Sequence, residues 1–255
     1  MKTSIPFTNS SIDSYGDLCT RFYDLDKPAP PAEAFAFFRA QAHAADGPVL
    51  EAMCGSGRFL IPLAQEGLAI DGVDASPAML AACRARSGGL QVRLFQQRLD
   101  QLDLPGRYAA ILIPAGSFGL LVDDGERARA LERMAAHLLP GGRLVFTCTT
   151  PAGRSQPGNS HREVTGPDGE RITLDVDAMA EDAEVDGFRC AYELFRHDLP
   201  IRREIETIRL RYLTEAAIRD ELIQVGFTRI SITKAWDGTP LGDTDSEMLV
   251  LSHRG

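Results

Sequence analysis

The chain has 255 residues, of which 44% are hydrophobic and 25% are charged, proportions that exclude a disordered or fibrous protein. Its net charge of −9 has the wrong sign for neutralising nucleic-acid phosphates, so no nucleic-acid partner is expected. The least polar long stretch, residues 108–122, is shorter than the about 20 apolar residues that span a bilayer, which predicts no membrane helix.

The cysteines and histidines argue against a metal site. Five cysteines are scattered without a CxxC pair, and five histidines show no spacing that would place two ligands on one helical face. The first 20 residues also lack the apolar run of a secretory signal. We therefore expect reduced cysteines, no metal and a cytoplasmic location.

Between residues 48 and 150, short apolar runs alternate with helical patterns, which is typical of βαβ units and a parallel sheet. Strands are expected at residues 48–54, 68–74, 90–96, 107–117 and 143–150. Helices are expected at residues 58–67, 76–86 and 126–139, with Ser76 as an N-cap and Pro140 as a helix stop. This part of the chain predicts a doubly wound α/β sheet.

Beyond residue 150 the pattern changes to period-2 alternation, which predicts antiparallel strands up to residue 213. We expect one turn at the Pro-Asp-Gly of residues 167–169 and another at Leu199-Pro200. The acidic run of residues 175–186 is interpreted as a solvated hairpin tip. A helix at 214–226 and strands at 227–236 and 247–254 complete the chain.

The glycine turn after the first strand is flanked by two carboxylates. Glu51 precedes Gly55 and Gly57, and Asp74 ends the second strand. A carboxylate after the second strand can accept both hydroxyls of a ribose, whereas a carboxylate before the glycines would repel a pyrophosphate. The third glycine of a dinucleotide motif is also missing, because Leu60 follows. This arrangement favours S-adenosylmethionine, whose ammonium and sulfonium are cationic, over NAD.

These residues resemble the class I S-adenosylmethionine-dependent methyltransferases over nearly the whole chain. VLEAMCGSGRFLIPLA resembles their glycine motif, IDGVDASPAML their ribose motif, and LLPGGRLVF the segment leading into strand five. The resemblance implies a Rossmann-like seven-stranded sheet of order 3-2-1-4-5-7-6, with strand seven antiparallel and an antiparallel β insertion before the last helix. The cofactor would lie across the carboxyl ends of strands one, two and four.

The resemblance also implies roles for individual residues around the cofactor. Its methionine part would contact Glu51, Ala52 and Gly55, its ribose Asp74, and its adenine would lie between Ala75 and Met79. The other expected cofactor-binding residues are Gly57, Arg98, Leu99 and Ile113. The family usually has an acid where this chain has Arg98. Since Asp100 follows two residues later, the register stays open, and adenine recognition would fall to the Leu99 backbone amide. Met53 stands where a small residue is usual, and its side chain must turn away or the turn is reshaped.

Residues 15–26 resemble the family's cap helix, in which tyrosines close over cofactor and substrate. Tyr15 and Tyr23 are eight residues apart, slightly more than two helical turns, and can share a face. A hydroxyl there could bond the cofactor carboxylate, although both rings could equally pack the cap against the core. Arg58 is either a solvated first-turn residue or an electrostatic partner of that carboxylate, and Glu51 could instead cap a helix.

The predicted function is transfer of a methyl group from S-adenosylmethionine to an oxygen or nitrogen of a small molecule. Ser117 and Phe118 are expected to face the acceptor, and Tyr23, His161 and His197 are weak candidates for a catalytic base. No single catalytic residue is obligatory, because the sulfonium is already reactive. The alternatives are an NAD-dependent oxidoreductase and a catalytically idle protein that binds the same cofactor.

The chain is expected to form one methyltransferase domain, with no prediction of its oligomeric state. Residues 1–46 would form a helical cap, 47–150 the cofactor core, 155–213 the roof of the acceptor pocket, and 214–255 the closing helix and strands. The predicted roof has more acids than bases, which makes a polyanionic acceptor the least expected kind.

Overall fold

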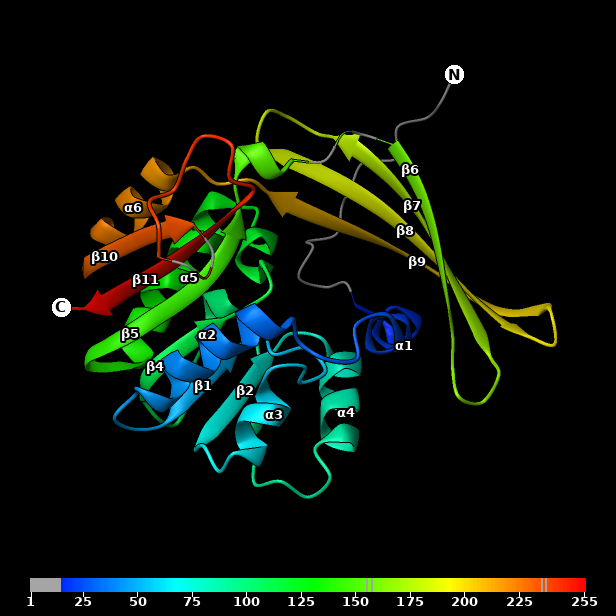
Figure 1. Cartoon of the computed structure of the whole chain (residues 1–255), viewed down its shortest axis with the longest axis horizontal. Coiled ribbons are helices and arrows are strands. Elements are labelled where there is room, and N and C mark those ends of the chain that lie inside the picture. Colours follow the sequence, from blue (N-terminus) through cyan, green and yellow to red (C-terminus); the bar gives the residue numbers. More distant parts are fainter. Residues whose placement is uncertain (1–14, 155, 157, 235, 237) are drawn as a thin grey trace.

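A computed structural model describes residues 15–154, 156, 158–234, 236 and 238–255 (Figure 1). The part of the predicted cap at residues 1–14 lies outside the described residues. The helices are α1 (Asp17–Asp26), α2 (Ala32–His43), α3 (Leu60–Gln65), α4 (Pro77–Arg86), α5 (Asp124–His137) and α6 (Glu215–Gln224). Among these helices, none is long and apolar enough to cross a bilayer.

A mixed sheet forms the centre of the molecule. Its strands are β1 (Val49–Ala52), β2 (Ile70–Asp74), β3 (Leu94–Gln96), β4 (Tyr108–Ile113), β5 (Leu138–Thr149), β10 (Phe227–Lys234) and β11 (Glu247–Arg254). Their order is β10-β11-β5-β4-β1-β2-β3, with β11 antiparallel to both of its neighbours. Because β10 and β11 are the sixth and seventh strands of this sheet in chain order, the predicted order 3-2-1-4-5-7-6 is confirmed.

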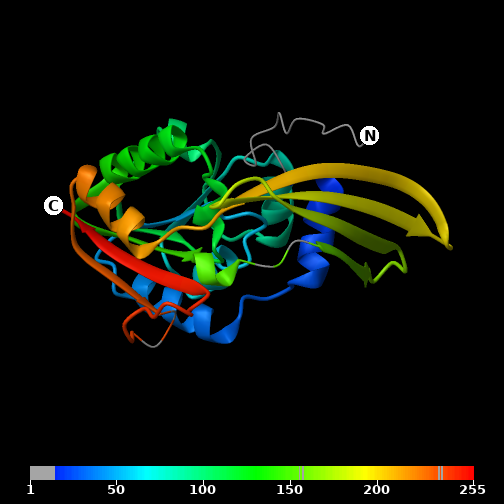
Figure 2. The same ribbon diagram turned by 90° about the horizontal axis from the view of Figure 1, so that it is seen from above.

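Alternating side chains of the sheet fill two apolar layers. Ala110 and Leu112 of β4 pack with α2, α3 and α4, whereas Ile111 and Ile113 pack with α5 and α6. Figure 2 shows α2 and α5 on opposite sides of the sheet. Both faces of β4 are therefore buried, as its near-continuous apolar sequence indicates. The α2 segment packs on the sheet rather than capping a site.

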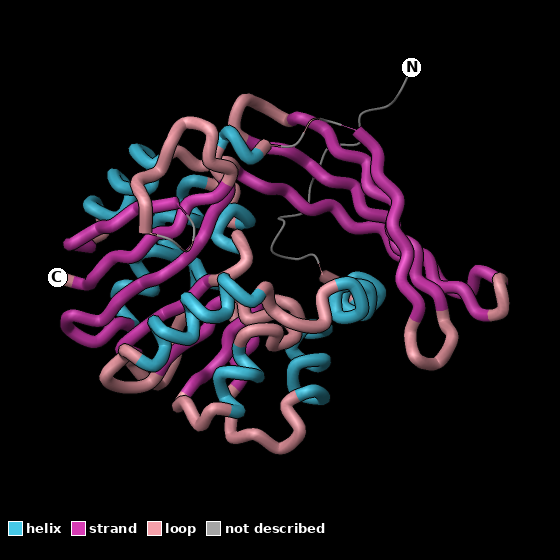
Figure 3. The backbone as a smooth tube through the Cα atoms, viewed as in Figure 1, coloured by secondary structure: helices cyan, strands magenta, loops and turns pink. Residues whose placement is uncertain are grey.

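A second sheet projects from the first as a long antiparallel ribbon (Figures 1 and 3). It contains β6 (Gly158–Thr165), β7 (Arg171–Ala180), β8 (Val185–Arg196) and β9 (Leu199–Arg211) in that order. Its inner face packs on α1 through an apolar cluster that includes Leu18, Phe22 and Tyr192. The predicted antiparallel insertion is confirmed, and it holds α1 against its inner face.

Two predicted boundaries are wrong for physical reasons. The β8–β9 turn is His197-Asp198 rather than Leu199-Pro200, and both turn residues have positive φ, as a two-residue hairpin requires. Helix α5 ends at His137, and Pro140 already lies within β5, where the β4–β5 pairing is irregular. The predicted N-cap Ser76 is confirmed, since its side chain accepts from the Met79 amide of α4, and the Thr214 side chain accepts from the Ala217 amide of α6 in the same way.

Only the middle of the acidic run of residues 175–186 is a hairpin tip, since residues 181–184 form the exposed turn between β7 and β8, as predicted. Asp175 and Asp177 lie within β7, and Asp186 is buried against Arg154 and the Tyr212 hydroxyl. Asp186 thus joins the segment leaving the central sheet to the segment returning to it. Sequence composition does not reveal this because both partners lie at least 26 residues away.

Candidate functional site

The glycine turn that leaves β1 is closely packed. Met53, Gly55 and Gly57 all have positive φ. A Cβ on Gly57 would lie 2.7 Å from Cys83 Sγ and 2.8 Å from Ile61 Cδ1, so a side chain would be strained and would clash. The turn therefore brings its backbone to the carboxyl edge of the sheet, beside the end of β2.

Asp74 ends β2 and is oriented by backbone amides. Its Oδ2 accepts from Gly55 N and its Oδ1 from Ser76 N, both at 2.8 Å. Burial raises the pKa of Asp74, and the amides of Ser76, Gly55 and Ala75 oppose that rise. Each carboxylate oxygen retains acceptor capacity after one hydrogen bond, so Asp74 can accept two further hydroxyl groups.

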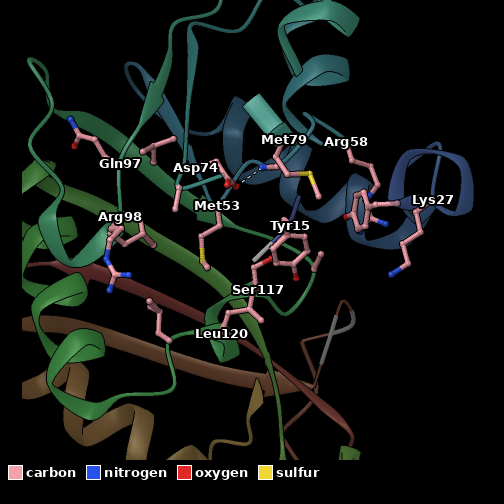
Figure 4. Close-up of a pocket in the computed structure, with 17 residues that line it drawn as sticks. Tyr15, Lys27, Met53, Arg58, Asp74, Met79, Gln97, Arg98, Ser117 and Leu120 are labelled. Atoms are coloured by element: carbon pink, nitrogen blue, oxygen red, sulfur yellow. Dashed lines mark hydrogen bonds between the residues drawn. The ribbon is translucent and has the colours of Figure 1, made fainter. Parts of the chain in front are cut away.

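A cavity opens over this edge, with walls from the central sheet and from α1 (Figure 4). Its lining comprises Tyr15, Tyr23, Lys27, Met53, Gly55, Arg58, Val73, Asp74, Ala75, Met79, Gln97, Arg98, Leu99, Ala115, Ser117, Leu120 and Leu121. Nine of the predicted site residues are in this wall, namely Tyr15, Tyr23, Gly55, Asp74, Ala75, Met79, Arg98, Leu99 and Ser117.

Glu51 lies behind the wall as a buried acid without a full set of partners. It is 2% exposed, and its Oε2 has no hydrogen-bond partner among the described residues. Burial raises its pKa well above the usual value, the Arg58 charge opposes the rise and Asp74 adds to it. Within the described part of the chain, no helix amide donates a hydrogen bond to the Glu51 side chain, so the alternative of a helix cap is not supported.

Arg58 is the cationic counterpart of Glu51. It is 9% exposed and lines the cavity, and within the described part of the chain its Nε has no hydrogen-bond partner. Its guanidinium lies 5.3 Å from the Tyr23 ring centroid. The alternative of a solvated first-turn residue is therefore wrong. The site presents an acid and a guanidinium, each buried with an unused polar atom.

The two tyrosines reach the cavity by a different route from the one predicted. Tyr15 precedes α1 and has a φ of 72°, so it does not share a helical face with Tyr23. Ser76 Oγ donates to the Tyr15 carbonyl at 2.7 Å, which fixes this segment beside Asp74. Burial raises the pKa of both phenols, so both are neutral near pH 7.

Carboxylates of β9 hold the start of α1. Glu206 accepts from the amides of Tyr15 and Gly16, and Glu204 accepts from Leu18 N at 2.9 Å. These are helix N-terminal amides that have no partner within the helix. The ribbon therefore supplies the cap that α1 lacks in its own sequence.

The far half of α1 is tied to the glycine turn. Asp24 accepts from Ser56 Oγ, and Arg86 donates to Asp24 at 2.7 Å. Since Ser56 lies between Gly55 and Gly57, these bonds join α1 to the turn itself. Together with the Tyr15–Ser76 bond, they fasten α1 over the cavity.

Met53 and the adenine-side residues differ partly from expectation. Met53 lines the cavity, so its side chain does not turn away (Figure 4). Its positive φ shows that the turn is shaped around it. Asp100 is buried and pairs with Arg98 at 3.0 Å, which leaves Arg98 rather than Asp100 in the wall. Among the described residues of this segment, Gln97, Arg98 and Leu99 line the cavity and Asp100 does not.

Several predicted residues lie outside the wall. Glu51, Ala52, Gly57 and Ile113 are behind it, and Phe118 stacks on Phe146 with ring centroids 4.2 Å apart. Phe118 is thus a core residue rather than an acceptor contact. It lies in the short 3-10 helix Ser117–Leu120, which instead presents Ser117 and Leu120 to the cavity.

Neither predicted histidine base lies in the cavity. His161 is on β6, where its Nδ1 lies 2.6 Å from Asp175 Oδ1 in an exposed pair. His197 occupies the exposed β8–β9 turn. A lone histidine gives no signal of which face of a strand it occupies, and both predictions are wrong on position.

The acceptor side of the cavity includes residues that sequence reasoning missed. Ala115 has a φ of 63°, a conformation uncommon for a residue with a Cβ, directly after β4. Gly119 packs on β9, where an added Cβ would lie 2.7 Å from Leu210 Cδ1. Lys27, Gln97, Leu120 and Leu121 were also missed. The one feature of the sequence that could have indicated these residues was the position of residues 115–121 directly after a buried strand.

Comparison with known proteins agrees with this site. A protein family described as "Methyltransferase domain" matches residues 49–142. The cypemycin N-terminal methyltransferase of Streptomyces sp. is 26% identical over 66% of this chain and 70% of its own length. A dTDP-3-amino-3,6-dideoxy-alpha-D-glucopyranose N,N-dimethyltransferase of Streptomyces fradiae is 34% identical over 38% of this chain and 37% of its own length.

The fold has a close counterpart among solved structures. An S-adenosylmethionine-dependent methyltransferase from Clostridium acetobutylicum superposes with a TM-score of 0.76 at 19% identity, covering 91% of this chain and 96% of that one. Residues 49–142 thus match a methyltransferase domain, and the chain around them has the fold of an S-adenosylmethionine-dependent methyltransferase.

Proposed function

We propose that the protein transfers a methyl group from S-adenosylmethionine to an oxygen or nitrogen of a small-molecule acceptor. The carrying observation is the pair of buried ionisable side chains near Asp74. Glu51 and Arg58 each have an unpartnered polar atom, and such atoms are costly unless a ligand satisfies them. The methionine part of the cofactor carries an ammonium, which complements Glu51, and a carboxylate, which complements Arg58.

The residues of the cavity fit the rest of the cofactor. Asp74 would accept the ribose hydroxyls, since its backbone partners leave one acceptor position on each oxygen. Met79, Ala75 and Leu99 supply an apolar surface for adenine. When bound, the cofactor supplies an electrophilic methyl group. The chain has to hold the attacking atom of the acceptor in line with that methyl group and to exclude water from the cavity.

Among the described residues, water is excluded from the cavity mainly by α1 and the residues just before it. Tyr15 and Tyr23 close one side of the cavity, and both phenols stay neutral. A nitrogen acceptor needs only an unprotonated amine, whereas a hydroxyl gains from a base. One relative reported above is named an N,N-dimethyltransferase, and other relatives are named ubiquinone biosynthesis O-methyltransferases, so the proposal keeps both nitrogen and oxygen as acceptor atoms.

We also propose that residues 1–255 form one methyltransferase domain that works in the cytoplasm on acceptors other than nucleic acid. The net charge of −9 opposes a phosphate backbone. All five cysteines are buried and free, as suits a reducing compartment. An NAD-dependent oxidoreductase is unsupported, because Glu51 would face a pyrophosphate at the glycine turn.

Calorimetry with S-adenosylhomocysteine tests the proposal. Wild-type protein should bind it, and Asp74→Ala should weaken binding by about tenfold or more, because two hydrogen bonds to a charged acceptor are lost. Asp46→Ala, which removes an exposed carboxylate, is the matched control and should bind as the wild type does. The proposal fails if the wild type does not bind, or if Asp74→Ala binds equally well while remaining folded.

A further inference from the structure

A second cavity adjoins the cofactor cavity on the other side of α1. It lies between α1 and the inner face of the ribbon, and it shares Tyr15, Tyr23 and Lys27 with the first cavity. Arg58 lines only the first, and Arg162 of β6 lines only the second. Lys27 is therefore the cation common to the two cavities.

Lys27 remains accessible to solvent, and its charge is only partly offset, by Asp26. Among the described residues it forms no ion pair within 4.0 Å, and its neighbour Asp26 is already bound by Arg162 at 2.7 Å. Its ammonium lies 5.3 Å from the Tyr23 ring centroid. Burial lowers the pKa of Lys27, and the Arg58 and Arg162 charges lower it further. An anion at this position would relieve the repulsion among the three cations.

The acids of the ribbon do not supply that anion. Asp175 and Asp177 alternate with Leu174 and Val176, which line the second cavity, so these acids point to the opposite face. Glu204 and Glu206 do face α1, but its backbone amides occupy them. The acids of the predicted roof therefore do not prevent a single anionic group from binding beside Lys27, and the expectation against a polyanionic acceptor stays a prediction.

An apolar floor extends beside Lys27. Val176, Phe188 and Ile208 line the second cavity from three neighbouring strands and remain partly exposed. Aliphatic and aromatic side chains left open beside an unpaired cation form a surface for an amphipathic ligand. Its reactive end would reach the cofactor cavity past Tyr23.

Resting on the proposed function, we infer that the methyl acceptor carries an anionic group, a carboxylate or phosphate, bound by Lys27 beside an apolar portion held against the ribbon. Arg58 is excluded as the acceptor's partner because it lines only the cofactor cavity, where Glu51 lies nearby. Lys27 serves the acceptor because it alone among these cations reaches both cavities.

Ligand-detected NMR titration of the protein saturated with S-adenosylhomocysteine tests the inference. The probes are 3-phenylpropionate and phenyl phosphate, compared with the neutral 3-phenylpropionamide and benzyl alcohol. At low salt the anionic probes should bind about tenfold more tightly than their neutral counterparts. A preference confined to phenyl phosphate assigns a phosphate ester, and one shown by both anions assigns a carboxylate-tolerant site.

Variants of Lys27 distinguish the effect of its charge from an effect on folding. Lys27→Met should reduce the preference for anions to within about twofold, and Lys27→Arg should retain it. Lys234→Met is the matched control, since Lys234 lies on β10 away from both cavities, where it pairs with Asp245. The preference of this variant for anionic probes should be unchanged. Affinity for S-adenosylhomocysteine should stay within about twofold in all three.

The inference is overturned if neutral and anionic probes bind alike, if none binds, or if the preference survives Lys27→Met. It is also overturned if Lys27→Met weakens S-adenosylhomocysteine tenfold, because Lys27 would then hold the cofactor. Failure of wild-type protein to bind S-adenosylhomocysteine is a separate result, which refutes the proposed function before any probe is added.

Discussion

At the residue scale, Glu51 shows how a ligand site costs stability. A buried carboxyl with an unsatisfied oxygen is unfavourable in the folded protein, and its raised pKa expresses that cost. A protein under selection for stability alone would place an apolar residue in this strand. The persistence of an acid there is explained by a cationic ligand that the acid binds.

Glu51→Gln should stabilise the protein, and the gain should depend on pH. Because the folded pKa exceeds the unfolded one, the folded state holds a proton that the unfolded state loses, and wild-type stability falls as pH rises above about 4.5. Glutamine removes this loss. We expect a gain of ~1–3 kcal/mol at pH 7 and almost none at pH 4, measured by urea denaturation. An equal gain at both pH values would contradict it.

Cofactor binding should release a proton from Glu51. An ammonium group favours the carboxylate, so the pKa of Glu51 should fall on binding, and affinity should increase as pH rises from 5 to 8. Calorimetry of S-adenosylhomocysteine in buffers of different ionisation enthalpy measures the released proton. Glu51→Gln should abolish most of the release, and unchanged release in that variant would assign the proton to another group.

At the element scale, α1 is held from outside by the ribbon. Glu204 and Glu206 cap its first turn, whereas its own N-cap residue, Gly16, has no side chain to do so. Charged acceptors at a helix N-terminus also interact favourably with its dipole. The folding of α1 over the cofactor is thus coupled to the presence of β9.

Glu206→Gln should loosen α1 and speed cofactor release. The variant loses the charge on two amide hydrogen bonds, which should cost ~1–2 kcal/mol of local stability. Hydrogen exchange of α1 amides should quicken, and dissociation of S-adenosylhomocysteine should accelerate by about threefold to tenfold. Glu163→Gln changes an exposed acid of the same ribbon and should leave both rates unchanged.

The sequence predicted those parts of the site that depend on strand ends. Gly55 and Asp74 were foreseeable because adjacent parallel strands deliver their carboxyl ends to one edge. Lys27 and the left-handed Tyr15 were not, because their positions depend on how α1 docks between two sheets. Phe118 was misassigned since packing on Phe146, distant in sequence, decides which side of its short helix faces inward.

At the scale of the whole molecule, the two sheets are joined by a buried polar group. Arg154 binds Asp186 and also donates to the carbonyls of Asp182 and Ala183, while Tyr212 bonds Asp186 at 2.9 Å. These residues lie where the chain leaves the central sheet and where it returns. They hold the ribbon at a fixed angle to the cofactor edge.

Arg154→Met should destabilise the joint, because Asp186 would stay buried without its cationic partner. We expect the Tm to fall by roughly 5–10 °C, measured by calorimetry. Arg189→Met removes an exposed guanidinium that pairs with Asp177 on the outer face, and it should shift the Tm by about 1 °C or less. Similar shifts for both variants would show that the buried pair has no special part in joining the sheets.

The dependence of α1 on the ribbon also constrains how acceptor specificity can be exchanged between relatives. Residues 15–27 and 158–211 meet through Glu204, Glu206 and the cluster around Phe22, although more than half the chain separates them. A chimaera that takes only the ribbon from a relative would leave the recipient's α1 without the carboxylates that cap it and without its apolar partner. The two segments form one structural unit built from two separate parts of the chain, and transplanting specificity requires moving both.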